Sequence, residues 1–153
     1  MPAFLLFAME NTLENIIEPL LEAGQVLMEV FEDNRGRYIR VVIDSVNELT
    51  LTDTTHLTRT LKETEILTEK FPEGFRLEVS TPGIGSPLVQ PFQYKKNLNR
   101  DLNVTYLENG SEVKTTSKIV SANNYSFELE NDNETFFLSY DQVKSAKVKV
   151  SFK

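Results

Sequence analysis

The sequence predicts two domains of different class, an α+β domain followed by a small all-β barrel of the SH3 or Sm type. Three observations support this prediction. In the first half, apolar residues recur at helical spacing in two segments and at strand spacing in three. In the second half, short alternating runs are separated by turn residues. A segment rich in proline and glycine lies between them. The expected bounds are an extension over 1–8, the α+β domain over 9–80, a connector over 81–88 and the barrel over 89–153.

The first domain is expected to have the order α-β-β-α-β, a three-stranded sheet with two helices. Residues 11–24 carry an apolar stripe at helical spacing, interrupted by Pro19, which predicts a kinked helix or two shorter pieces. Residues 26–32 and 37–44 are rich in β-branched and aromatic residues and flank the turn sequence Asp33-Asn34-Arg35-Gly36, so they predict an antiparallel hairpin.

The second expected helix starts with Thr52 or Asp53 as its N-cap and ends before Pro72. Leu57 and Leu61 form its apolar i, i+4 pair. Residues 75–80 alternate apolar and polar side chains and predict the third strand.

The second domain is expected to contain five short strands. The predicted strands cover 102–107, 112–122, 125–130, 134–139 and 146–152, with Tyr125 on the same face as Phe127 and Leu129. Asn109-Gly110 is a strong hairpin signal, since both residues tolerate a positive φ. No helix is expected in this half until a single turn near Asp141.

Charge is distributed unevenly along the chain. Residues 1–80 carry a net charge of -8 and residues 81–153 a net charge of +1, within a total of -7. An acidic chain is a poor non-specific ligand for nucleic acid, because phosphate affinity comes mainly from cations that displace counterions. Any contact with RNA is therefore expected to be local or supported by a protein partner.

The residue types of an enzyme site are scarce. The chain has no cysteine, and His56 is its one histidine, expected on an exposed helix face. No transition-metal site, cofactor or small-molecule substrate is predicted. The absence of cysteine fits a reducing cytoplasm. The apolar run 3–9 lacks the preceding basic residue and the following cleavage site of a secretory signal, and no run is long enough to span a bilayer.

The connector, TPGIGSPL, does not match a catalytic or phosphate-binding motif. Gly83-Ile84-Gly85 follows a strand without opening a helix, and Leu88 occupies the place of the third glycine in the dinucleotide signature. Leu88 also replaces the second glycine of a nucleophile elbow around Ser86. The structural interpretation is a stiff joint, with φ fixed at Pro82 and Pro87.

These residues resemble the bacterial RimP family, whose hallmark at the domain junction reads approximately E-V-S-S-P-G-L-D-R-P-L. Seven positions match it: Glu78, Val79, Ser80, Pro82, Gly83, Pro87 and Leu88. Thr81 and Ile84 are close substitutions. The family's Asp-Arg pair is replaced by Gly85 and Ser86, which suggests a divergent branch. The resemblance spans roughly residues 10–150.

The resemblance implies a cytoplasmic, non-enzymatic ribosome maturation factor. Such proteins bind the immature small ribosomal subunit, and their barrel associates with a ribosomal protein near the decoding centre and with nearby rRNA. We expect a monomer without a membrane partner. The candidate contact residues are Lys95, Lys96, Arg100, Lys144, Lys147 and Lys149. Lys147 and Lys149 are expected to share a strand face. Alternatively, these lysines only discourage edge-to-edge aggregation.

An alternative function is a stand-alone Sm-like or SH3-like module that binds RNA or peptide off the ribosome. Tight, sequence-selective RNA binding with a steep salt dependence would favour it, and the acidic composition argues against it.

Overall fold

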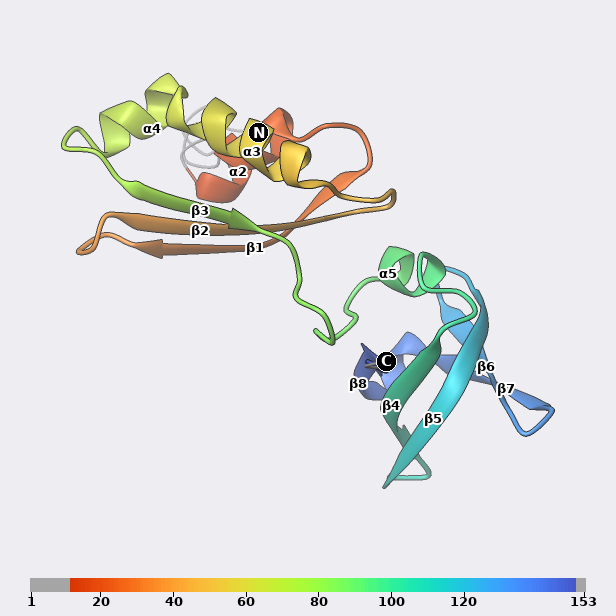
Figure 1. Cartoon of the computed structure of the whole chain (residues 1–153). Helices are drawn as coiled ribbons and strands as arrows, with labels where there is room; N and C mark the ends of the chain where they lie inside the picture. Colours follow the sequence, from red (N-terminus) through yellow and green to blue (C-terminus); the bar gives the residue numbers. More distant parts are fainter. Residues whose placement is uncertain (1–11, 151–153) are drawn as a thin grey trace, which may run out of the picture. The chain divides into compact units, whose positions relative to one another are not determined.

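The computed structural model describes residues 12–150, so the expected extension over 1–8 lies outside the described residues. The chain divides into two compact units, with the boundary between Pro82 and Gly83. The first unit contains a three-stranded sheet with helices, and the second contains a five-stranded antiparallel sheet (Figure 1). The expected order of an α+β fold followed by an all-β fold is confirmed.

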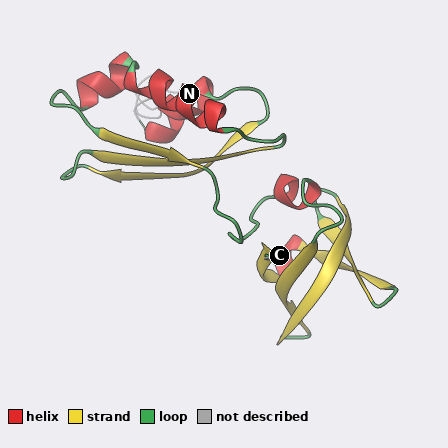
Figure 2. Ribbon diagram, viewed as in Figure 1, coloured by secondary structure: helices red, strands yellow, loops and turns green. Residues whose placement is uncertain are grey.

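The sheet of the first unit has the order β1-β2-β3. Strands β1 (Gln25–Asp33) and β2 (Tyr38–Ser45) form the expected antiparallel hairpin. Strand β3 (Arg76–Ser80) pairs with β2 in parallel. A parallel pair needs a long crossover, and the helices between β2 and β3 provide it. The helices described in this unit, within residues 12–82, cover the same face of the sheet (Figure 2).

Pro19 divides the first helical segment. Helix α2 (Leu13–Ile17) starts at the N-cap Thr12, whose side chain accepts a hydrogen bond from the Asn15 amide. The 3-10 helix η1 (Glu18–Leu20) follows with Pro19 in its first turn. Because proline lacks the amide donor of a continuing α-helix, two short pieces form.

The second helical segment differs from its prediction in two ways. Its N-cap is Thr50, not Thr52 or Asp53, and Asp53 completes a capping box as the third helical residue. Hydrogen bonds from Thr50 lower the pKa of Asp53. The segment is also divided into α3 (Leu51–Lys62) and α4 (Glu65–Lys70). Threonine hydroxyls along it bond to carbonyls one turn earlier, as between Thr64 and Thr60, and such bonds favour bending.

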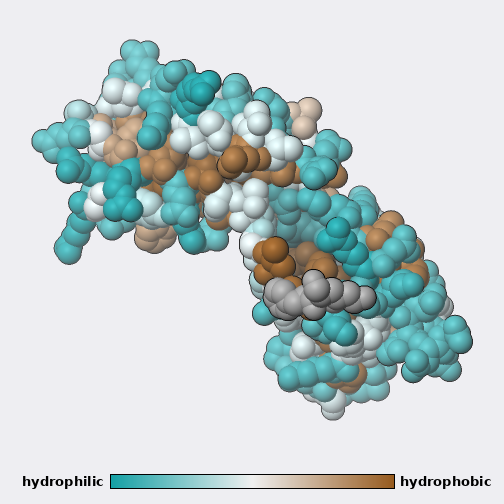
Figure 3. All heavy atoms as spheres, in the orientation of Figure 1, coloured by the Kyte–Doolittle hydropathy of each residue, from teal (hydrophilic) through white to brown (hydrophobic). Residues whose placement is uncertain are grey.

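The core of the first unit lies between the helices and the sheet. Ile39, Val41 and Ile43 of β2 point toward the helices, where they meet Leu57 and Leu61 of α3. Burial of each such side chain contributes about 1.5–3 kcal/mol. In Figure 3, apolar residues of this unit show between the helix and sheet layers, while the outer helix surfaces are hydrophilic.

The sheet of the second unit has the order β7-β6-β5-β4-β8 and is antiparallel throughout. Its strands are β4 (Asp101–Glu108), β5 (Ser111–Ala122), β6 (Ser126–Asn131), β7 (Glu134–Ser139) and β8 (Val143–Val148). Asn109 and Gly110 both have positive φ, as the predicted hairpin turn requires.

This sheet must curl strongly. Its outermost strands, β7 and β8, are joined by the 3-10 turn η2 (Tyr140–Gln142), the turn expected near Asp141. A flat five-stranded sheet would hold its outer strands roughly 19 Å apart, at about 4.8 Å per strand spacing. The four steps from Ser139 to Val143 span at most about 15 Å, at 3.8 Å per residue. The two outer strands are therefore brought toward each other.

Two predictions for this unit are wrong. Helix α5 (Pro91–Lys95) was not expected, although Pro91 suits a first helical turn and Gln90 and Gln93 form a capping box. Tyr125 is 83% exposed and does not share the buried face of Phe127 and Leu129. Strand β6 begins only at Ser126, because the Asn123 side chain accepts hydrogen bonds from the amides of Tyr125 and Ser126 and holds a turn there.

Helix α5 brings an aromatic side chain into the core of the second unit. The ring of Tyr94 lies 4.7 Å from that of Phe127 and 4.8 Å from that of Tyr140, centroid to centroid. Burial, with a smaller contribution from Tyr140, raises the pKa of Tyr94 to about 12. The fold therefore favours the neutral phenol.

Alkaline pH is expected to destabilise the protein through Tyr94. Since its folded pKa of about 12 exceeds the ordinary value of 10.0, its contribution is present below pH 10.0 and is lost as pH rises toward 12. Urea unfolding at about pH 9 and about pH 11.5 measures how much the free energy of unfolding falls between the two pH values. This fall should be smaller for Tyr94→Phe than for the wild type. Equal losses would contradict this assignment.

Candidate functional site

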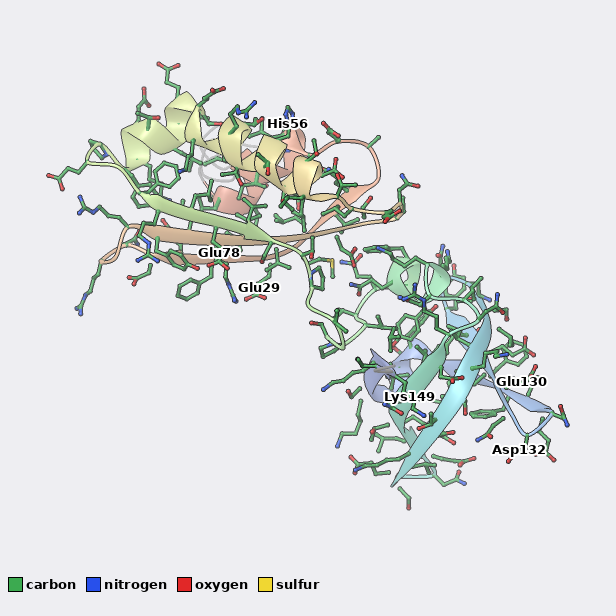
Figure 4. The ribbon with its side chains drawn as sticks, in the orientation of Figure 1. Glu29, His56, Glu78, Glu130, Asp132 and Lys149 are labelled. Atoms are coloured by element: carbon green, nitrogen blue, oxygen red, sulfur yellow. The ribbon has the colours of Figure 1, made fainter. Side chains whose placement is uncertain are left out.

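The first part of the junction motif ends strand β3. Val79 packs against the core of the first unit, and Ser80 pairs with Val42 at the end of the parallel ladder. Glu78 lies on the opposite face, away from the helices (Figure 4). It accepts a hydrogen bond from the Tyr38 hydroxyl, and this bond raises the pKa of Tyr38. These three residues therefore hold the last strand of the first unit in place.

The second part of the motif belongs to the second unit. The Ser86 amide donates to the Gly83 carbonyl at 3.0 Å, which closes a turn in which Gly85 has φ +79°. After Pro87, the Leu88 amide donates to the Ala146 carbonyl of β8 at 2.7 Å, and the Leu88 side chain packs against the core. Pro82 is the last residue of the first unit. The motif thus ends one unit and anchors the start of the other.

Within residues 12–150 there is no group of three or more histidine, aspartate or glutamate side chains that could hold a metal ion. His56 lies on the outer side of α3 (Figure 4), with its Nε2 atom 3.6 Å from an Oε1 atom of Glu22. No helix of the described residues is long and apolar enough to cross a membrane.

The basic residues after the connector lie at one end of the second unit. Lys95 and Lys96 follow each other at the C-terminal end of α5, and Arg100 precedes β4. The Lys95 ammonium donates to the Asn124 side chain at 2.7 Å. All three residues are exposed.

The lysines in β8 and just after it differ from one another. Lys144 forms an ion pair with Glu112 at 2.9 Å, and this contact lowers the pKa of Glu112. Lys147 pairs with Asn103 of β4, and the Lys149 amide donates to the Asp101 carbonyl at 2.8 Å. Since Asp101 and Asn103 are two residues apart, Lys147 and Lys149 lie on the same face of the sheet. Lys144 is therefore engaged in a surface ion pair within the protein.

Two further lysines on this face were not predicted as candidate contacts. Lys114 and Lys118 of β5 pair with Thr105 and Asp101 of β4, so they lie across β4 from the lysines of β8. The signal was present in the alternation of residues 112–119, in which Lys114, Thr116 and Lys118 occupy every second position. Without the strand register, the sequence could not show that this polar face of β5 and the lysine face of β8 lie on the same side of the sheet.

Together these features define a class of protein: two compact units joined at a proline- and glycine-rich segment, with a cationic sheet face on the second unit. Residues 15–85 match the model of the RimP N-terminal domain. This match supports membership of the RimP family of ribosome maturation factors. The matched segment ends at Gly85, within the junction motif.

The turn at Gly85 generates a prediction about the divergent junction. Gly85→Ala should lower the stability of the protein by about 1 kcal/mol, because a side chain at φ +79° is strained. Gly83→Ala is the matched control, since its φ is not positive and its new methyl group would meet only the Ser86 hydroxyl at 3.5 Å. Denaturant unfolding should separate the two variants. A loss for Gly83→Ala as large as that for Gly85→Ala would contradict this interpretation.

Proposed function

We propose that this protein is a ribosome maturation factor that binds the immature small ribosomal subunit and assists its assembly. The observation that carries the proposal is the RimP N-terminal domain over residues 15–85. The protein acts as a monomer in the cytoplasm, without a cofactor, a membrane partner or a small-molecule substrate. Its role is to bind and position other molecules, and no reaction is assigned to its residues.

The second unit is proposed to close into an SH3- or Sm-like barrel that contacts a ribosomal protein near the decoding centre. Support comes from the short η2 connection between β7 and β8 and from a core to which all five strands contribute. The residues proposed to contact the nearby rRNA are exposed, and they are Lys95, Lys96, Arg100, Lys147 and Lys149. Lys144 contributes less than its neighbours, because Glu112 already neutralises it.

The junction motif is proposed to be a stiff joint between the two domains, over 9–80 and 89–153. Pro82 and Pro87 restrict the backbone on either side of the Gly83–Ser86 turn. The Leu88 amide and side chain fix the exit of the joint on the second unit. A joint of this kind supports binding of one large partner through two surfaces.

Removal of the gene should impair maturation of the small subunit. We expect fewer mature small subunits in sedimentation profiles, accumulation of unprocessed small-subunit rRNA, and recovery when the wild-type gene is returned. The tagged protein should sediment with immature small-subunit particles and be depleted from mature ribosomes. Normal profiles and normal rRNA processing in the deletion strain would overturn the proposed function.

A further inference from the structure

The outward face formed by β8, β4 and β5 consists of three rows of polar side chains. Each β4 residue lies between one partner on β8 and one on β5, and the alternating residues Leu102 and Val104 point into the core. The rows are Lys149, Asp101 and Lys118; Lys147, Asn103 and Thr116; and Ser145, Thr105 and Lys114. We refer to these nine residues as the polar sheet face.

The polar sheet face has a positive charge although the whole chain is acidic. Among its nine residues four are lysines, and Asp101 is the single carboxylate. The four lysines are exposed, and no ion pair within residues 12–150 engages them. Glu112 borders the face on β5, where it forms an ion pair with Lys144 and also interacts electrostatically with Lys114. Glu130 borders it on β6 opposite Lys118.

A shallow hollow lies inside the polar sheet face, with a volume of about 290 Å³. Four of its lining residues belong to the polar sheet face, namely Asn103, Thr105, Lys114 and Thr116, and the other two are Val104 and Thr115. The Thr116 hydroxyl donates to the Asn103 side-chain oxygen at 2.6 Å, which leaves the amide NH₂ of Asn103 available as a donor. Lys147 pairs with Asn103, so a second ammonium group lies beside the hollow. Ammonium, amide and hydroxyl donors are the groups that contact phosphate oxygens in nucleic-acid complexes.

The face lacks aromatic groups on which bases could stack. None of its nine residues is aromatic, so it offers no stacking platform for unpaired bases. The strongly exposed aromatic residues of this unit, Tyr125 and Phe137, lie on other parts of it, at the start of β6 and on β7. A cationic face without stacking groups is suited to contacts with the phosphate backbone, which do not depend on sequence.

We propose that the polar sheet face binds the phosphate backbone of RNA, with Lys114, Lys118, Lys147 and Lys149 as its cationic contacts and Asn103 and Thr116 at its centre. The choice of RNA among phosphate polymers rests on the proposed function. Strand spacings of about 4.8 Å and row spacings of about 7 Å place the four ammonium groups over an area wide enough for several consecutive phosphates.

Binding of a fluorescent 20-nucleotide single-stranded RNA, followed by anisotropy between 50 and 200 mM salt, tests this proposal. The wild type should bind with a log K against log salt slope of roughly -3, since each lysine-phosphate contact contributes about -0.7 for a single strand. Replacing all four lysines by glutamine should remove most of this slope and weaken binding at least tenfold at 50 mM salt.

Lys144→Gln is the matched control, since this lysine lies on the same strand as Lys147 but is paired with Glu112. It should leave the slope and affinity close to those of the wild type. Thermal unfolding shows that each variant is folded, and single Lys114→Gln and Lys147→Gln variants replace the fourfold variant if that one does not fold.

Absence of RNA binding by the wild type, an unchanged slope in the lysine variants, or an equal loss in Lys144→Gln would overturn the proposal. Equal affinity for a poly-glutamate peptide of the same charge would also overturn it. The proposed function is tested separately: if the protein sediments with immature particles but does not bind the RNA, only this inference fails.

Discussion

The pairing of β4 with β5 on one side and β8 on the other is the constraint on which the second unit depends. Because side chains alternate along a strand, one register directs Leu102 and Val104 into the core and Asp101 and Asn103 outward. The same register brings the lysines of β5 and β8 onto one face. A slip by one residue would expose the apolar core of β4 and bury its polar residues, so the core and the cationic face are maintained together.

The two units divide the charge of the chain between them. The first half of the chain has a net charge of -8. It forms the three-stranded sheet, one face of which is covered by helices. The second half is close to neutral, at +1, and concentrates four lysines on nine residues of one face. An acidic protein can approach RNA only where cations outnumber carboxylates locally, because the sequence-independent affinity comes from counterion release.

Much of the fold could be predicted from the sequence, and the exceptions have physical causes. Alternation and turn residues identified all eight strands, including the Asn109-Gly110 hairpin, within a few residues. Helix α5 was missed because it has only five residues and buries Tyr94 and Gln93, too few positions for a periodic pattern. The threonine run of residues 50–68 indicated a helix, but hydroxyl bonds to backbone carbonyls, which divide it, leave no pattern of their own. Two of the four lysines of the candidate surface, Lys147 and Lys149, could be placed on one face from the alternation of a single strand. Lys114 and Lys118 lie on the same face only because of the pairing of β4 with β5 and β8, which the sequence does not reveal.

The most direct test of this account is lysine acetylation footprinting of the full-length protein, free and bound to immature small subunits. The account predicts that Lys114, Lys118, Lys147 and Lys149 become protected in the complex, whereas the exposed Lys62 on α3 keeps its reactivity. Unchanged reactivity of those four lysines in a complex that does form would contradict the central claim that the β8-β4-β5 face is the surface that meets the precursor.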